Sequence, residues 1–166
     1  IRDSWEADQD LNSAMQNSVN WYFQAIDSQL GINRVQEFLN KIEYGNQTTS
    51  SNLDLYWSDF SLKISPLEQV TLLKKFNTNE FHLNFQNVFS VKNAIKIAST
   101  PNGNFYGKTG TGRVNGQDIN GWFIGYVETS DNSYYFATNI QSDSNATGKK
   151  AFEITSDILK KLHIWN

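Results

Sequence analysis

The chain has 166 residues, of which 39% are apolar and 14% aromatic, so it can build a packed core. Its 14 basic and 17 acidic residues give a net charge of −3 without a long run of either sign, which disfavours a nucleic-acid partner. No stretch reaches the roughly 20 apolar residues that span a bilayer, so no direct membrane contact is expected of this segment. The absence of cysteine excludes a disulfide framework and a thiol nucleophile.

Apolar residues at helical spacing fill the first part of the chain. They predict one continuous amphipathic helix over residues 11–30, with Gly31 at the position where glycine ends many helices. A shorter helix is predicted over residues 32–42, and the Tyr44-Gly45-Asn46 segment that follows is typical of a turn.

Three more helices are predicted further along. Ser65 is followed by proline and, at the third position, by glutamate, which indicates a helix start and predicts a helix to about Phe76. Apolar spacing predicts another helix over residues 88–98, closed by a turn at 101–104. The last segment, residues 148–162, returns to helical spacing.

Between the last two helices the periodicity changes to that of strands. Aromatic and β-branched runs occupy residues 105–111, 122–128 and 134–140, separated by Asn115-Gly116 and Asp131-Asn132. This pattern predicts an antiparallel meander. The fold class is therefore α+β, and the lack of repeats and linkers indicates a single domain.

The most distinctive local pattern is Lys108-Thr109-Gly110-Thr111-Gly112, inside a predicted strand. Two glycines weaken a strand and often mark a place where another molecule approaches the backbone. The lysine and threonine side chains could bind an anion there, and exposed N–H groups could polarise a carbonyl group as an oxyanion hole does. A glycine-rich hairpin with a solvated lysine is the alternative.

Ser18 is the second unusual position. It falls on the apolar stripe of the predicted helix over residues 11–30, where a hydroxyl group is costly unless it finds a partner. A core serine that donates to a carbonyl of its own helix is the ordinary explanation. Asn20 would face elsewhere on a regular helix, but a turn between two helices would alter that.

The other candidate residues have ordinary explanations when each is taken alone. The Tyr44-Gly45-Asn46 segment is a turn, and Trp57 is a core or rim aromatic residue. His82 and His163 lie beside apolar residues without a second ligand at metal spacing, so both are predicted to be structural. No metal site is expected.

In series, these segments resemble the penicillin-recognising serine acyl-transferases. The ordered set is Ser18-Val19-Asn20, Tyr44-Gly45-Asn46, Trp57, Lys108-Thr109-Gly110 and Gly121-Trp122-Phe123. The set is similar to class D β-lactamases, the oxacillinase-type enzymes, and to the homologous extracellular sensor domain of transmembrane β-lactam receptors. The resemblance covers nearly the whole chain. It implies an antiparallel sheet flanked by helices on both faces, with the C-terminal helix packed on the sheet.

The resemblance also exposes a missing part. The family's nucleophile is the serine of a Ser-x-x-Lys motif at the start of a buried helix, and no Ser-x-x-Lys occurs in these 166 residues. Residues 1–166 are therefore expected to be the C-terminal part of one domain, with the segment that carries Ser-x-x-Lys as a required partner. Alone, the chain should not perform the family's chemistry.

The chemistry that the resemblance implies is acyl transfer from a β-lactam antibiotic to the motif serine. Ser18 matches the serine that relays a proton toward the lactam nitrogen. Lys108 and Thr109, followed by Gly110, match the strand motif that binds the substrate carboxylate. The backbone N–H of Thr111 would supply half of the oxyanion hole.

Further roles follow from the same resemblance. Trp57 matches the indole that donates to the motif lysine, which these families carry as a carbamate made from carbon dioxide. Tyr44 and Asn46 would shape the wall of the site, and Lys149 or Lys150 could help to bind the carboxylate. No metal or organic cofactor is implied.

Asn20 divides the possible functions. Class D hydrolases usually carry an apolar residue there, whereas Ser-x-Asn is familiar from sensors and penicillin-binding proteins. A polar amide facing the lysine would favour loss of carbon dioxide after acylation and so stall deacylation, which suits a sensor.

Three functions stay open. The larger number of hydrolases favours hydrolysis slightly. The main alternative is a sensor with a long-lived acyl-enzyme, and the third is a non-catalytic binding module that forms no covalent adduct. The resemblance implies an extracellular or cell-surface location, secreted or membrane-anchored through sequence outside this chain.

Overall fold

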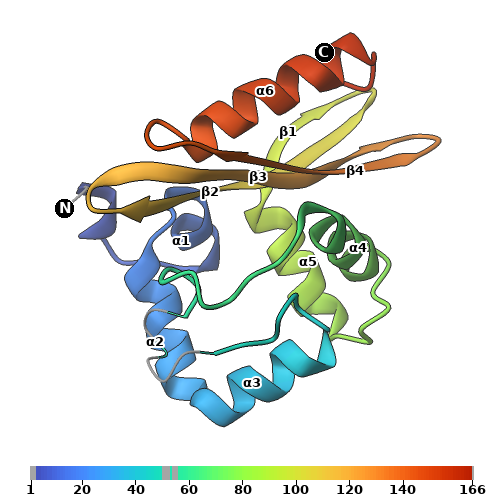
Figure 1. The fold of residues 1–166 in the computed structure, drawn as a ribbon. Helices are drawn as coiled ribbons and strands as arrows, with labels where there is room; N and C mark the ends of the chain where they lie inside the picture. Colours follow the sequence, from blue (N-terminus) through green and yellow to red (C-terminus); the bar gives the residue numbers. More distant parts are fainter. Residues whose placement is uncertain (1–2, 50–52, 54–55, 166) are drawn as a thin grey trace. The chain divides into compact units, whose positions relative to one another are not determined.

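A computed structural model of the chain describes residues 3–49, 53 and 56–165. In these residues it contains six α-helices and one four-stranded antiparallel sheet, which confirms the α+β class (Figure 1). The chain divides into two compact units. The first comprises residues 1–65 and 75–95, and the second comprises residues 66–74 and 96–166.

The first unit contains a 3-10 turn (Asp3–Trp5), α1 (Leu11–Asn17), α2 (Asn20–Leu30), α3 (Ile32–Lys41) and α5 (Phe85–Ala94). In this unit, α1 and α5 begin at residues whose side chains cap the helix, whereas α2 and α3 have no side-chain cap. Asp10 accepts a hydrogen bond from the N–H of Ser13 at 2.7 Å, and the Ser13 hydroxyl accepts one from the N–H of Asp10 at 2.9 Å. This reciprocal pair satisfies two donors that a helix start leaves open, and so it fixes where α1 begins.

The prediction of one helix over residues 11–30 is wrong, because the helix is interrupted at Ser18. Ser18 adopts the left-handed conformation, with φ of 53°, and its N–H donates to the carbonyl of Met15 at 3.3 Å. Val19 follows in an extended conformation, and α2 begins at Asn20. Apolar residues keep helical spacing across the break, so periodicity alone does not reveal it.

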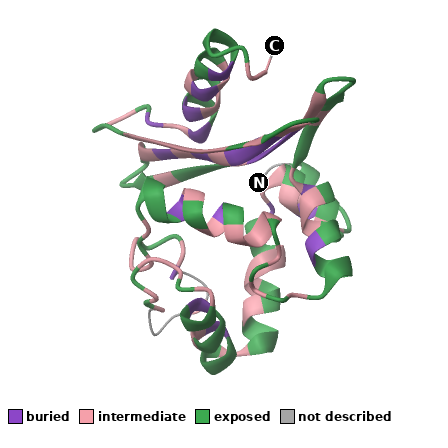
Figure 2. Cartoon of the chain, turned by 90° about the vertical axis from the view of Figure 1, so that its right-hand side faces the viewer, coloured by how far each residue is buried: buried purple, intermediate pink, exposed green. Residues whose placement is uncertain are grey.

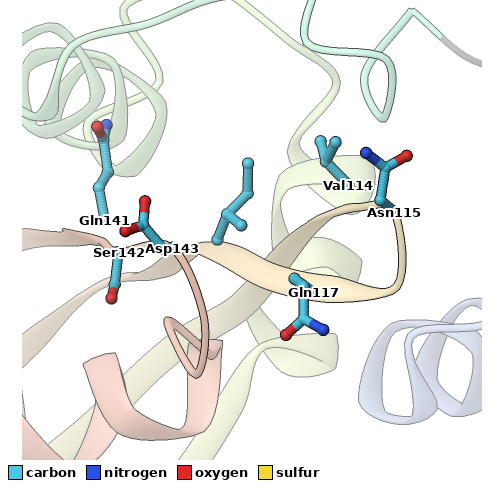
Figure 3. A pocket seen from close by; sticks show the side chains of 7 residues that line it. Val114, Asn115, Gln117, Gln141, Ser142 and Asp143 are labelled. Atoms are coloured by element: carbon cyan, nitrogen blue, oxygen red, sulfur yellow. The ribbon is translucent and has the colours of Figure 1, made fainter.

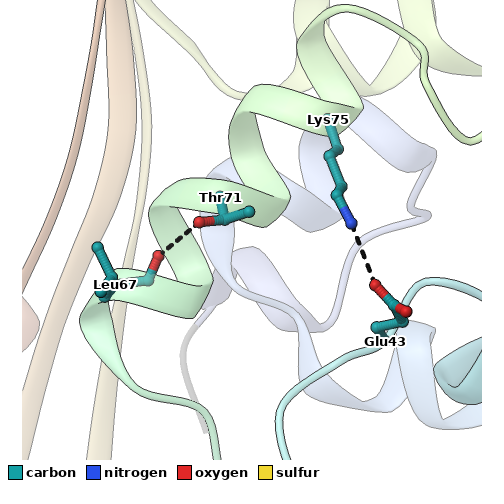
Figure 4. A network of polar contacts seen from close by, with 4 residues as sticks. All are labelled: Glu43, Leu67, Thr71 and Lys75. Carbon is teal, nitrogen blue, oxygen red and sulfur yellow. Dashed lines mark hydrogen bonds and ion pairs between the residues drawn. The ribbon is translucent and has the colours of Figure 1, made fainter.

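The core of the first unit forms around α3 and the segment after it. Val35 and Leu39 on α3 are buried together with Tyr56, and the partly buried residues packed against them are Tyr44, Leu53, Trp57 and Leu62. At the edge of the unit, the ammonium group of Lys75 lies 3.1 Å from a carboxylate oxygen of Glu43 (Figure 4). Both side chains are solvent-accessible, so this ion pair contributes at most about 1 kcal/mol.

The helix α4 (Pro66–Asn77) begins where the sequence predicts, directly after Ser65. Within it, the hydroxyl of Thr71 donates to the carbonyl of Leu67 at 3.0 Å (Figure 4). The predicted helix over residues 88–98 is too long: α5 ends at Ala94, and residues 96–100 form a strand instead.

The sheet of the second unit is a meander in the order β1-β2-β3-β4. Its strands are β1 (Lys96–Thr100), β2 (Gly103–Val114), β3 (Gln117–Thr129) and β4 (Ser133–Gln141). The three predicted strands are confirmed, and each is longer than expected. Asn115 and Gly116 both have positive φ, as a tight two-residue hairpin requires.

The C-terminal helix α6 (Gly148–Lys161) packs on this sheet and shares one apolar core with it. That core consists of Phe105, Phe123, Val127, Ala151 and Leu159, with Phe136 and Phe152 among the partly buried residues around it. Figure 2 shows the buried residues along one side of α6 and along the middle of the strands. This arrangement confirms the predicted packing of the C-terminal helix.

Candidate active site

Ser18 and Asn20 flank the buried residue Val19 at the junction of α1 and α2. Val19 is fully buried, whereas Ser18 is half-buried and Asn20 is exposed. The Val19 N–H donates to the carbonyl of Ala14 at 2.9 Å, which closes the end of α1. Ser18 is therefore presented from a strained interhelical turn, and not from the apolar stripe of a helix as the sequence suggests.

The Tyr44-Gly45-Asn46 turn is confirmed, and it is tightly bound to a later segment of the first unit. Gly45 has φ of 48°, and a Cβ atom there would collide with the backbone carbonyl of Lys63. The side-chain amide of Asn46 donates to the carbonyl of Ser61 and accepts from the N–H of Lys63, both at 2.8 Å. The amide expected to shape the site wall thus has a structural function.

Tyr44 and Trp57 both pack against the cluster of Val35, Leu39 and Tyr56, called the Tyr56 cluster below. Burial raises the pKa of the Tyr44 phenol. Burial also raises the pKa of Tyr56, assisted by the nearby Asp27 carboxylate. The structure therefore gives Trp57 at least a packing role. The phenols of Tyr44 and Tyr56 in the same cluster stay protonated at neutral pH.

Residues Lys108 to Thr111, called the lysine motif below, lie on β2 in the second unit. Their side chains point to alternate faces of the sheet. Phe105 belongs to the core under α6, so strand alternation places Thr109 and Thr111 on that face and Lys108 on the other. Lys108 Nζ donates to the carbonyl of Thr109 at 2.7 Å. Burial lowers the pKa of the Lys108 ammonium group, as expected for a cation removed from water.

Among the described residues, no neighbouring atom requires a glycine at position 110. A Cβ atom at Gly110 would have only the Cβ of Trp122, at 3.7 Å, within 4 Å among the described residues. At Gly107, Gly121 and Gly125, by contrast, a Cβ atom would collide with neighbouring atoms. The bare backbone at Gly110 is consistent with the predicted close approach of another molecule.

Among the described strands, only part of the outer edge of β2 has a partner. β1 pairs only with residues 103–106 of β2, whereas β3 pairs with it along its whole length. In an antiparallel pair, alternate residues direct their N–H and C=O groups away from the partner strand. Part of the backbone of residues 107–114 therefore lacks a strand partner among the described residues, and an N–H group directed outward there could polarise a bound carbonyl group.

The N-terminus of α6 lies against the motif, a contact that the sequence does not predict. The N–H of Gly148 donates to the hydroxyl of Thr111 at 2.9 Å. Glycine at the first position of α6 is the available signal, because glycine is a poor helix former and here permits close packing. Lys149 and Lys150, the candidate carboxylate ligands, are exposed, and Lys149 Nζ lies 3.9 Å from Oε1 of Glu153.

The candidate residues are thus divided between the two units. Ser18, Asn20, Tyr44, Asn46 and Trp57 belong to the first unit, and Lys108, Thr109, Gly110 and Thr111 belong to the second. An open pocket in the second unit is lined by Val114, Asn115, Gln117, Ile119, Gln141, Ser142 and Asp143 (Figure 3). None of the predicted site residues lines that pocket.

The two histidines lie in turns. His82 and His163 have φ of 52° and 55°, and their N–H groups donate to the carbonyls of Asn79 and Lys160, each at 3.0 Å. Among the residues that the structure describes, no group of three acidic or histidine side chains could hold a metal ion. In the same residues, no helix is both long enough and apolar enough to cross a membrane.

The order of motifs and the fold define a penicillin-recognising class. The chain belongs to the penicillin binding protein transpeptidase domain family, whose model matches residues 2–160. This confirms the resemblance read from the sequence.

Similar proteins include both sensors and hydrolases. The regulatory protein BlaR1 of Bacillus licheniformis is 48% identical over 161 residues, which are 97% of this chain and 27% of BlaR1. The probable beta-lactamase YbxI of Bacillus subtilis is 39% identical over 159 residues, which are 96% of this chain and 57% of YbxI. The chain therefore spans less than two thirds of either relative.

A solved structure agrees with the fold. The C-terminal domain of the Bacillus licheniformis BlaR penicillin-receptor superposes with a TM-score of 0.94 at 46% identity. The match covers 99% of this chain and 67% of that structure. This chain thus shares the fold of about two thirds of that structure.

Proposed function

We propose that the chain is the C-terminal part of a β-lactam sensor domain that is acylated on a serine and holds the acyl group for a long time. The observation that carries this proposal is the 46% identity to a penicillin-receptor domain across 99% of the chain. The 48% identity to BlaR1, against 39% to YbxI, supports the choice of a sensor over the hydrolase that the larger number of known hydrolases favours. The Ser18-Val19-Asn20 turn supports the same choice.

The nucleophile of this domain lies outside residues 1–166. Its hydroxyl oxygen attacks the β-lactam carbonyl, the ring C–N bond breaks, and the serine proton passes to the lactam nitrogen. Ser18 delivers that proton, Lys108 and Thr109 hold the substrate carboxylate, and the N–H of Thr111 stabilises the developing oxyanion. All atoms of the antibiotic stay on the protein, because opening the ring releases no leaving group.

A carbamate formed from carbon dioxide on the lysine of Ser-x-x-Lys would supply the base that accepts the serine proton. Trp57 is the residue of this chain suited to hold that anion, because its indole group offers one N–H donor on an otherwise apolar surface. Its half-buried position against the Tyr56 cluster limits access of water to such a donor. A desolvated N–H donor binds an anion more strongly than a solvated one does.

Hydrolysis by a class D β-lactamase is the second candidate, supported by the 39% identity to YbxI and by the presence of Trp57. In that case the acyl group would be released by water. A binding module without covalent chemistry is the third. The sensor and the hydrolase both place the domain outside the cell, secreted or held at the surface through sequence beyond this chain.

Intact-mass spectrometry of the complete domain, with its Ser-x-x-Lys segment, tests the proposal. Benzylpenicillin should increase the mass by that of one whole antibiotic molecule, and changing the motif serine to alanine should abolish the increase. Residues 1–166 alone should form no adduct. A complete domain that binds benzylpenicillin reversibly but stays unmodified would be a binding module, and the proposal would be wrong.

A further inference from the structure

The first peptide of α6 packs directly against β2 and β3 at the lysine motif. A Cβ atom at Gly148 would lie 2.6 Å from the carbonyl oxygen of Gly110, 2.9 Å from its nitrogen and 3.0 Å from the Cβ of Thr109. On the neighbouring strand, a Cβ atom at Gly121 would lie 2.6 Å from the carbonyl carbon of Thr147. No side chain fits on either side of this contact, so the start of α6 lies directly on the sheet.

One hydrogen bond joins the start of α6 to the lysine motif. The N–H of Gly148 donates to the Oγ1 of Thr111 at 2.9 Å, and Thr111 pairs across the sheet with Gly121. The donor is one of the first N–H groups of α6, which have no partner within their own helix. The bond therefore satisfies a buried donor and at the same time fixes the side chain of Thr111.

The same part of β2 has little other support. β1 ends its pairing at Tyr106, so only β3 restrains β2 between residues 107 and 114 among the described strands. A strand held on one side bends more readily than one held on both. An oxyanion donor, however, must be held within a few tenths of an ångström of its working position.

We propose that Thr111 is a positioning residue, whose side-chain bond to α6 holds its own backbone N–H in place as the oxyanion donor. This inference rests on the proposed function, because that function assigns the backbone N–H of Thr111 to the oxyanion hole. The contribution is greatest in the transition state, when negative charge develops on the carbonyl oxygen. Loss of the bond should thus slow acylation itself and leave initial binding of the antibiotic almost unchanged.

The test compares Thr111→Val with a matched control in the complete domain. Valine keeps the β-branched shape and removes the acceptor, and Thr111→Ser restores an acceptor without the methyl group. Thr155→Val is the control, because Thr155 on α6 shares a 2.7 Å hydrogen bond with Thr138 on β4, in the same helix-sheet contact but away from the motif. Stopped-flow acylation by nitrocefin separates the first-order acylation constant from the binding constant.

Thr111→Val should lower the acylation constant about 10- to 100-fold and leave the binding constant within about threefold. Thr111→Ser should recover most of that loss, and Thr155→Val should acylate as the wild type does even where its Tm falls equally. If Thr111→Val fails to fold, Gly148→Ala provides the second variant. Its Cβ atom should push the start of α6 away from the sheet, while Thr111 itself is retained. It should slow acylation in the same way.

Equal acylation by Thr111→Val and Thr155→Val, or unchanged acylation by a folded Gly148→Ala, would overturn the positioning role. A wild-type domain that forms no adduct would overturn the proposed function, and the inference would fall with it. The two failures are distinguishable, because only the second abolishes the wild-type adduct.

Discussion

Asn46 and Lys63 are joined by a reciprocal pair of hydrogen bonds. The N–H of Asn46 donates to the carbonyl of Lys63 at 2.9 Å, and the N–H of Lys63 donates to the Oδ1 of Asn46 at 2.8 Å. Asn46 thereby replaces a backbone group and pairs the turn after α3 with a segment that returns beside it. The turn belongs to the framework of the first unit, whatever it also contributes to a ligand site.

Gly45→Ala should therefore destabilise the domain strongly. Gly45 combines a φ of 48° with backbone contact to Lys63, so alanine should lower the free energy of unfolding by more than about 2 kcal/mol. Gly31→Ala is the control, because Gly31 has φ of 79° but a Cβ atom there would meet no described atom within 4 Å, so it should cost about 1 to 2 kcal/mol through backbone strain alone. Urea unfolding of the complete domain measures both. Equal losses would show that the contact with Lys63 is unimportant.

Elements with a strong local signal can be predicted from the sequence, and junctions between elements cannot. The start of α4 after Ser65 and the hairpin at Asn115-Gly116 are predicted correctly, because capping and turn chemistry depend on neighbouring residues alone. The break at Ser18 is not predicted, since the apolar spacing continues through it. The strand β1 is not predicted either, because Ile95 and Ala98 extend the helical pattern of α5 across its true end.

In the candidate site as well, local features can be predicted from the sequence and long-range contacts cannot. The residues of the lysine motif can be selected from their order and spacing, because the family resemblance is carried by short segments. The contact of Gly148 with Thr111 joins positions 37 residues apart and depends on how α6 packs on the sheet. No local pattern encodes such a distance, although the glycine at the helix start is a sign of it.

Lys108→Ala should slow acylation by one to three orders of magnitude, about 1.4 kcal/mol for each factor of ten, because the substrate carboxylate loses its cation. The matched control is Lys96→Ala, which removes a lysine on β1 whose ammonium group lies 5.8 Å from the ring of Tyr106. That variant should acylate normally. Stopped-flow measurements with nitrocefin compare them, and equal rates for Lys108→Ala and the wild type would refute the role of Lys108.

The pH dependence of acylation gives a second measure of Lys108. Burial lowers its pKa below the usual 10.5, so the charged form should be lost at a lower pH than for an exposed lysine. Acylation should thus decline on the alkaline side, and Lys108→Ala should lack this decline. For stability the sign is opposite: the folded domain releases the proton first, so this group favours folding increasingly as pH rises between its folded and unfolded pKa values. A decline that persists in Lys108→Ala belongs to another group.

Two substitutions at Trp57 separate its packing from its hydrogen bond. Trp57→Phe keeps an aromatic ring against the Tyr56 cluster but removes the N–H donor, and it should weaken retention of carbon dioxide by about 1 to 3 kcal/mol. Acylation should fall, and added bicarbonate should restore part of it by mass action. Trp57→Ala should lose stability as well. Normal acylation by Trp57→Phe without bicarbonate would leave Trp57 with a packing role only.

Asn20 should control how long the acyl group stays. Its amide is exposed at the first position of α2, where a change to valine costs little packing. In a sensor, Asn20→Val should speed release of the penicilloyl group at least tenfold and leave acylation nearly unchanged, because the competing amide is removed from the lysine base. Asn17→Val, at the end of α1, serves as the nearby control. An adduct equally long-lived in wild type and Asn20→Val would contradict this mechanism.

The lifetime of the wild-type adduct tests the central claim most directly. The complete domain is acylated with one equivalent of benzylpenicillin, and intact-mass spectra taken from seconds to hours follow the adduct while chromatography counts the penicilloic acid released. A sensor domain should keep the adduct for hours and release less than one equivalent of product in that time. Rapid loss of the adduct together with many turnovers of excess benzylpenicillin would identify a class D hydrolase and contradict the account.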